Sequence, residues 1–279
     1  MKNRRFIERT VMGTLSFIKE NIYAEECASS KGFLQARDPR VRTLMVLLLL
    51  LSVLFSRNAA FIAGVYAACL LLAAVSSINI FQFLKRTWLF IPIFAFFIAV
   101  PALFDVFSPG DPLLTIWLYK FKLVITKQGA AGAGIFFIRV LTPVSLCVLL
   151  TLTTRHYALL KVLRIFKVPQ LFIMTLGMCY RYIYLFIEII QNTFTAIKSR
   201  TGYVASSSKG RHIVAFNMAS LWNRSYNLQN QVYNAMLSRG YNGEPHTTNE
   251  FRVSAADIAW LAATFLLFTG GLWITKFFN

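Results

Sequence analysis

Five long apolar stretches determine what this chain can fold into. They occupy residues 41–56, 59–75, 88–104, 129–153 and 255–275, and with their flanks each approaches the roughly 20 residues that a helix needs to cross a bilayer. Apolar residues make up 57% of the 279 residues and charged residues only 14%, which leaves too little polar surface for a soluble domain. The sequence therefore predicts an all-α integral membrane protein with about five transmembrane helices.

The net charge of +18 has a different meaning in such a protein from the one it has in a soluble chain. In a soluble chain it would suggest nucleic-acid binding. Here most Lys and Arg residues are expected to flank membrane helices on the cytoplasmic side and to contact anionic membrane lipids, so nucleic acid is not an expected partner. The pattern predicts a multi-pass protein of the bacterial inner or plasma membrane, with its N-terminus in the cytoplasm.

Residues 1–42 form the predicted cytoplasmic N-terminal segment. Apolar residues between positions 6 and 18 recur at the spacing of one helix face, with basic residues beside them, which is typical of an amphipathic helix lying on the membrane surface. At the end of this segment, Asp38 is expected to cap the first membrane helix and Pro39 suits its first position.

Residues 43–153 are predicted to hold four transmembrane helices, and two of the connecting segments are distinctive. Residues 76–86 end in two basic residues and are expected to form an inner loop. Residues 105–128 form the predicted outer loop, in which turn residues precede a stretch rich in β-branched and aromatic residues. That composition indicates either a short strand pair or an interfacial loop.

Arg139 lies near the middle of the fourth apolar stretch. Because an unpaired charge at that depth is costly, we expect this side chain to have a polar or acidic partner inside the helix bundle. The sequence leaves open whether this intramembrane arginine has a structural or a functional role.

Residues 154–252 are predicted to form a cytoplasmic module of long amphipathic coupling helices, inserted before a final membrane helix in residues 253–279. Residues 171–190 are apolar enough to cross the membrane, but a full crossing would place the many following basic residues outside, against the positive-inside bias. The helices expected in the module are residues 156–168, 169–198 and 216–239. A serine-rich flexible link at residues 204–209 would join the last two.

Two related tripeptides end the two longer helices of this module. The first consists of Ser199, Arg200 and Thr201, and the second of Ser238, Arg239 and Gly240. A small residue before an arginine lets a helix end approach a neighbour closely, and the guanidinium then presents a rigid fork of donors to a carboxylate. One such tripeptide could equally be an ordinary helix C-terminus, with glycine as the cap. Two copies in one membrane protein favour a docking device for a partner protein.

The sequence contains no recognisable catalytic or cofactor-binding motif. It has no phosphate-binding glycine loop, no zinc-protease motif and no nucleophile elbow. The three histidines are isolated, the four cysteines lack metal-ligand spacing, and the acidic residues are too scattered for a carboxylate pair. We therefore expect no catalytic residue, no metal site and no bound cofactor, and we predict that the chain is not an enzyme.

On several motifs the chain resembles the transmembrane T components of energy-coupling factor (ECF) transporters, in the cobalt-type CbiQ branch. The shared features are Asp38-Pro39-Arg40 before the first membrane helix, Leu152-Thr153-Thr154-Arg155 at the end of the fourth, Val168-Pro169, Tyr180-Arg181-Tyr182 and the two Ser-Arg tripeptides. The resemblance extends over nearly the whole chain. In the family, Ala stands in place of Ser199 and Ser238, and Gly in place of Thr201.

The resemblance implies a role and a set of partners. The two tripeptides would end coupling helices that dock on two ABC-type ATPase subunits, with Arg200 and Arg239 contacting acidic groups there. The ATPases would bind and hydrolyse ATP, and a separate membrane subunit would capture the substrate. The chain itself would transmit the ATPase motion to that subunit for cobalt uptake, although nickel and vitamin importers use close relatives.

Two other classes of protein remain open at this point. An integral membrane enzyme acting on a lipid or nucleotide at the inner surface would need converging polar residues, and the candidates are the asparagines of one helix face, Asn223, Asn227, Asn230 and Asn234. A self-contained ion channel is disfavoured because the sequence has no repeated pore motif.

Overall fold

The computed structural model describes residues 25–30, 32–56, 58–88, 91–102, 112–118, 121–201, 207–243 and 253–277. The chain divides into two compact units: Ala24–Leu159 with Phe251–Asn279 form the first, and Met1–Tyr23 with Leu160–Glu250 form the second. We call them the bundle unit and the inserted unit. The amphipathic helix predicted near the N-terminus lies outside the described residues.

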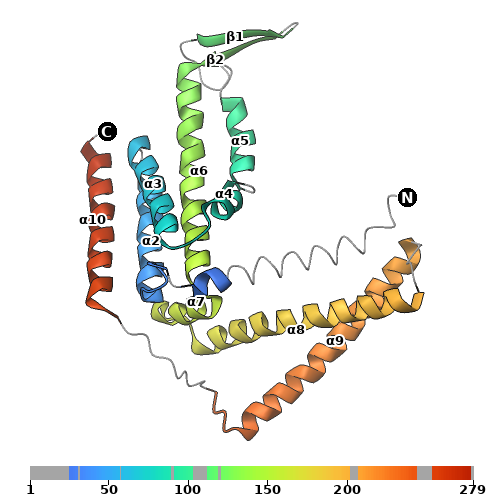
Figure 1. Ribbon diagram of the computed structural model, residues 1–279. Helices are drawn as coiled ribbons and strands as arrows, with labels where there is room; N and C mark the ends of the chain where they lie inside the picture. Colours follow the sequence, from blue (N-terminus) through green and yellow to red (C-terminus); the bar gives the residue numbers. More distant parts are fainter. Residues whose placement is uncertain are drawn as a thin grey trace. The chain divides into compact units, whose positions relative to one another are not determined.

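The bundle unit is built around one central helix. Its helices are α2 (Pro39–Phe55), α3 (Ala59–Val75), α4 (Ile80–Trp88), α5 (Ile91–Ala102), α6 (Lys127–Thr153) and α10 (Ala255–Phe277). The long helix α6 contacts α2, α3, α4 and α5, and α10 packs along α2 (Figure 1). The N- and C-terminal parts of the unit therefore meet through the pair α2 and α10, although they lie at opposite ends of the sequence.

Local sequence signals explain where several of these helices begin. The Asp38 carboxylate accepts a hydrogen bond from the Arg40 amide at 2.8 Å, and Pro39 is the first residue of α2, as the sequence predicted. Asn58 caps α3 in the same way, and Thr126 caps α6 through the Gly129 amide at 3.2 Å. Such side-chain acceptors satisfy amides that a helix start leaves without partners.

Large apolar side chains are found both inside the bundle unit and on its outer surface. Val53 of α2, Ile62 of α3 and Leu146 of α6 are fully buried between the helices. In contrast, Leu54 of α2 is 69% exposed and Phe97 of α5 is 67% exposed. Apolar side chains on both the inner and the outer faces of a helix are expected where the outer face contacts lipid.

By length and composition, two of the described helices could each cross a membrane, Lys127–Thr153 and Gln170–Ile197. The pair α4 and α5, bent by 45°, would make a third if it forms one broken span, and Ala59–Val75 and Ala255–Gly271 are shorter apolar helices. The chain is therefore a helical membrane protein, while the predicted number of five spans remains a prediction.

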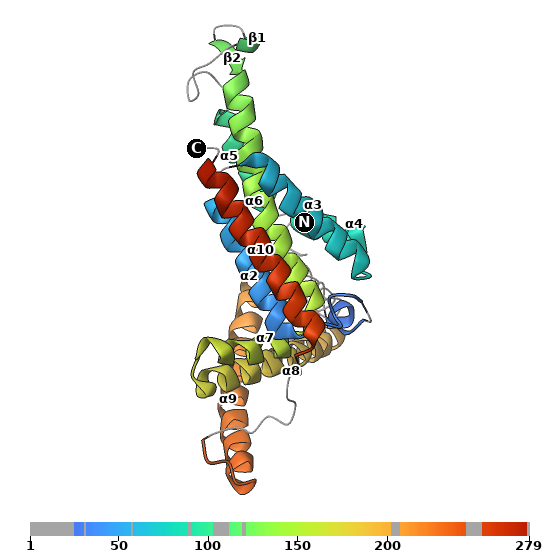
Figure 2. The same ribbon diagram turned by 90° about the vertical axis from the view of Figure 1, so that its left-hand side faces the viewer.

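The predictions for two connecting segments of the bundle unit had different outcomes. The inner loop expected at residues 76–86 is wrong in its second half, because α4 begins at Ile80, where the Asn79 side chain accepts a hydrogen bond from the Phe81 amide at 3.1 Å. The strand pair considered for the outer loop is present: β1 (Pro112–Leu118) and β2 (Phe121–Thr126) form an antiparallel hairpin. Both views place this hairpin beyond the N-terminal end of α6 (Figures 1 and 2).

The inserted unit consists mainly of two helices of 32 residues each, α8 (Gln170–Thr201) and α9 (Ser207–Ser238). Before them, α7 (His156–Val162) continues into a 3-10 turn, Leu163–Phe166, which ends at Lys167 in the left-handed conformation (φ 57°). The flexible link predicted at residues 204–209 is wrong in its second half, because α9 is already helical from Ser207, and residues 204–206 lie outside the described residues.

Candidate functional site

The two Ser-Arg tripeptides are at the C-terminal ends of α8 and α9, as their sequence context suggested. Ser199 and Arg200 lie in the last turn of α8, which ends at Thr201. Ser238 is the final residue of α9, and Arg239 and Gly240 follow it. Each serine hydroxyl donates to a carbonyl of its own helix, Ser199 to Ala196 and Ser238 to Asn234, both at 2.9 Å.

The second tripeptide is part of a Schellman cap. The Gly240 amide donates to the Leu237 carbonyl at 3.0 Å, and the Tyr241 amide donates to the Met236 carbonyl at 3.1 Å. Gly240 has φ +80°, in the left-handed region that a residue with a Cβ adopts only at a cost. The glycine of this tripeptide is therefore needed to end the helix, and Arg239 is the residue just before the turn.

The first tripeptide ends its helix differently. Thr201 is still helical, so the position that corresponds to Gly240 does not take the left-handed conformation here. Gly202, the next residue able to cap the helix, lies outside the described residues. The two tripeptides share an arginine at a helix end, but they are not copies of one backbone motif.

Both arginines are accessible and carry unused hydrogen-bonding capacity. Arg200 and Arg239 are exposed, and neither guanidinium forms an ion pair with any residue that the structure describes. A guanidinium has five N–H donors in a fixed plane, which matches a carboxylate in a bidentate pair. The arrangement can therefore bind two acidic groups, one at each end of the helix pair, without breaking an ion pair to any residue that the structure describes.

Tyr241 fixes the end of α9 relative to the start of α8. Its hydroxyl lies 3.2 Å from Met174 Sδ and donates to the Gly243 carbonyl at 3.0 Å. Because Met174 and Arg200 are both on α8 and a helix rises about 1.5 Å per residue, the Tyr241 contact and Arg200 are about 39 Å apart along the axis. Arg200 and Arg239 are thus at opposite ends of the inserted helix pair, a geometry that the sequence did not reveal.

Arg139, the arginine predicted to lie within the membrane, is in the middle of α6 in the bundle unit. Its Nη2 donates to the Ser56 carbonyl at 2.6 Å, and Ser56 is the C-cap residue of α2. The polar partner expected for this side chain is thus a backbone carbonyl at a helix end, where a cation is favourable. This contact joins α6 to α2 and supports a structural role for Arg139.

Among the described residues, no group of three or more His, Cys, Asp or Glu side chains could hold a metal ion. The four asparagines considered for an enzyme, Asn223, Asn227, Asn230 and Asn234, are all exposed along α9. An exposed row on one helix does not form the concave site that an enzyme needs.

Comparison with known proteins identifies the family. The family model for CbiQ, described as a cobalt transport protein, matches residues 31–249. The chain belongs to this family, as the sequence motifs indicated. Two similar relatives come from Methanocaldococcus jannaschii. The uncharacterized protein MJ1571 is 30% identical over 95% of this chain and 90% of its own length, and the uncharacterized protein MJ1089 is 25% identical over 82% and 84%.

Proposed function

We propose that this chain is the transmembrane coupling (T) subunit of an ECF-type importer, and that α8 and α9 are its coupling helices. The observation that carries the proposal is the pair of exposed arginines at opposite ends of these helices, neither with an ion-pair partner among the described residues. Two separate cationic ends suit two copies of an acidic partner, and two ABC-type ATPase subunits are partners of that kind.

We assign the remaining steps to partner subunits. Substrate capture is assigned to a separate membrane subunit, as the family resemblance implies, and no group of His, Cys, Asp or Glu among the described residues could hold a metal ion. ATP binding and hydrolysis are assigned to the two ATPases, with no cofactor held by this chain. The description of the family as cobalt transport proteins supports Co²⁺ as the substrate of the whole importer, with nickel or a vitamin as the alternative. The bundle unit would lie in the cell membrane, with the N-terminus and the inserted unit in the cytoplasm.

Mutation of the two arginines tests this function. The tagged chain is co-expressed with the two ATPases and the capture subunit, and the ATPases retained in mild detergent are quantified. Truncating one partner of a desolvated, hydrogen-bonded charge pair costs roughly 2–5 kcal/mol, so we expect Arg200→Ala and Arg239→Ala each to reduce retention by more than tenfold. Lys at either position should restore retention only in part, because an ammonium lacks the planar fork.

Arg224→Ala is the matched control, because Arg224 is also exposed on α9 but lies within the helix. It should retain the ATPases as the wild type does. If the double Arg200→Ala/Arg239→Ala variant, expressed at a matched level, binds the ATPases and supports Co²⁺ uptake normally, the tripeptides are ordinary helix ends and the proposal fails.

A further inference from the structure

Four charged residues form a cluster in the bundle unit, and three of them are buried. Asp38, Arg42 and Asp257 are each at most 6% exposed, and Arg37 borders them with a side chain that is 23% exposed. Two of these residues are basic and two are acidic, so the cluster is neutral overall. Buried charges are rare in proteins unless they are paired, which makes this cluster the least ordinary feature of the bundle.

Arg42 holds the end of α6. Its Nη1 donates to the Thr153 carbonyl, at the last residue of α6, although the two residues are 111 positions apart in the sequence. The negative charges of Asp38 and Asp257 offset part of the cost of burying the Arg42 guanidinium, although neither carboxylate forms a direct ion pair with it. Just beyond α6, Arg155 Nε donates to the Ser29 hydroxyl at 3.0 Å, which adds a second connection to the N-terminal segment.

Arg37 holds the start of α10. Its Nη1 lies 3.7 Å from Asp257 Oδ1, while Asp257 Oδ2 accepts a hydrogen bond from the Ser254 amide at 3.0 Å and so caps α10. The Arg37 guanidinium also lies 5.1 Å from the centre of the Phe33 ring, which in turn packs edge-on against Trp260 of α10 at 5.5 Å. The Arg37 side chain is thus held between a carboxylate and an aromatic ring.

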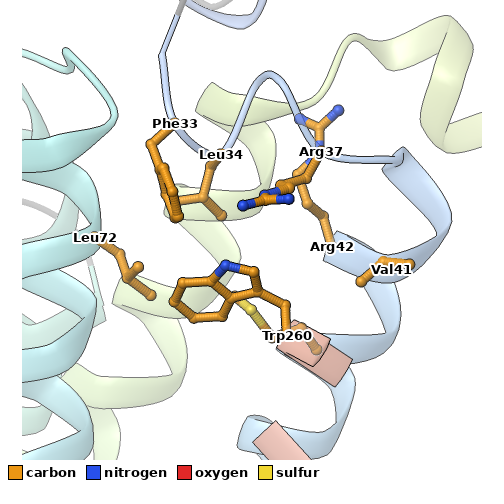
Figure 3. Close-up of a pocket in the computed structure, with 8 residues that line it drawn as sticks. Phe33, Leu34, Arg37, Val41, Arg42, Leu72 and Trp260 are labelled. Carbon is orange, nitrogen blue, oxygen red and sulfur yellow. The ribbon is translucent and has the colours of Figure 1, made fainter. Parts of the chain in front are cut away.

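The two arginines line a small hollow together with Phe33 and Trp260 (Figure 3). The Phe33 and Trp260 side chains lie next to one another there, with the arginines beside them. Within the described part of the chain, Arg42 Nε, Asp38 Oδ2 and Asp257 Oδ1 have no hydrogen-bond partner. The cluster is therefore held largely by charge, so the loss of one member alters the forces on the other three.

The cluster contacts the bundle unit near both points at which the inserted unit joins it. The inserted unit leaves the bundle unit after Leu159 and returns at Phe251. Thr153 and Arg155 lie shortly before the exit, and Ser254 and Asp257 shortly after the return. The short segment from Arg37 to Arg42, at the start of α2, thus supplies two arginines. They hold the end of α6 and the start of α10, which are the two points where the coupling helices are attached.

We propose that Arg37 and Arg42 are positioning residues that clamp the two attachment points of the coupling helices to the first membrane helix. This inference rests on the proposed function. A buried ion cluster rarely stabilises a fold more than apolar packing would, and its best-attested value is in fixing the relative positions of elements. With both attachment points fixed, movement of the coupling helices pulls on the bundle unit and is not absorbed by fraying of the ends of α6 and α10.

Arg37→Gln tests the clamp, since this partly exposed residue can be replaced without leaving a large cavity. Loss of the Arg37 charge leaves Asp257 to attract the Arg42 guanidinium away from the Thr153 carbonyl. In the purified full-length chain, we expect amide hydrogen exchange to rise at least fivefold both at residues 254–260 and at residues 150–156. Arg37→Lys, which keeps the charge, should restore slow exchange, and Lys127→Gln, which removes an exposed charge from α6, should change neither segment.

The complete importer in liposomes then provides a functional measurement. We expect Arg37→Gln to retain the ATPases within twofold of the wild type, but to transport at least tenfold less radioactive Co²⁺ per ATP hydrolysed. Faster exchange at the start of α10 alone, or an unchanged ratio of uptake to hydrolysis, would overturn the clamp. A wild-type chain that retains no ATPase would instead refute the proposed function, and a wild-type importer that transports no Co²⁺ would refute the proposed substrate. In either case the amide-exchange measurement would still test the clamp.

Discussion

Gly240 is the position at which the geometry of the second Ser-Arg tripeptide, and its proposed docking role, can be tested most directly. Its φ of +80° allows the two Schellman hydrogen bonds that turn the chain directly after Arg239. An L-residue in the left-handed region costs about 1–2 kcal/mol relative to glycine. Gly240→Ala must therefore either bear this strain or unwind the cap and release the carbonyls of Met236 and Leu237 to water.

Either outcome changes the direction in which Arg239 points from the end of α9. A cost of about 1.4 kcal/mol corresponds to a tenfold change in an equilibrium constant, so we expect ATPase retention to fall by roughly five- to thirtyfold. Amide exchange at residues 236–241 should rise by a similar factor. Asn tolerates the left-handed region better than Ala does, so Gly240→Asn should lose less.

Gly177→Ala is the matched control for this experiment. Gly177 lies within α8, and a Cβ added there would meet no other atom within 4 Å. Alanine in a helix interior is about 0.5–1 kcal/mol more favourable than glycine, so this variant should be neutral or slightly stabilised. If Gly240→Ala retains the ATPases and the slow amide exchange of the wild type, as Gly177→Ala should, the cap does not position Arg239 and the reasoning is refuted.

Three further predictions concern the bundle unit and the topology. Arg139→Leu removes the hydrogen bond to the Ser56 carbonyl and should lower the free energy of unfolding by about 1.5–3 kcal/mol, measured by thermal unfolding in detergent; an unchanged melting temperature would contradict the structural role. Ser207→Cys, on a cysteine-free background, should resist a membrane-impermeant thiol reagent in intact cells, and labelling from outside would contradict a cytoplasmic inserted unit. Gly32→Ala should destabilise the bundle, because the new Cβ would collide with the Ser76 carbonyl; unfolding at the wild-type temperature would show that the loop can move aside.

The sequence predicted well those features that depend on neighbouring residues. Asp38 and Pro39 start α2 because the Asp38 carboxylate binds an amide within one turn and the proline ring fixes its own backbone φ angle. The apolar stretch at residues 59–75 likewise coincides with α3. The composition of residues 105–128 favoured a strand pair or an interfacial loop, and part of it forms the hairpin β1–β2. Local signals of this kind are present in the sequence even without knowledge of the fold.

Contacts between distant residues could not be predicted in the same way. The Arg42–Thr153 and Arg37–Asp257 contacts depend on how α2, α6 and α10 pack, and apolar periodicity does not specify which helices become neighbours. One local signal was available, because Ser254 and Asp257 have the spacing of a helix capping box, which would have identified the carboxylate as a cap. It would not have revealed that the same carboxylate also binds an arginine far away in the sequence.

Because Tyr241 contacts Met174, the length of α8 from Met174 to Arg200 sets the distance between the two cationic ends. That length can change only by whole residues. Removing one residue between Met174 and Arg200 would shorten the distance by about 1.5 Å but rotate Arg200 by about 100° around the helix axis. Removing seven would shorten it by about 10 Å and return the arginine to within about 20° of its original direction. The spacing between the two cationic ends can therefore change only in steps of about one or two helical turns if both are to keep facing their partners. A pair of ATPases that sits closer together or farther apart would need a helix α8 that differs by such a step.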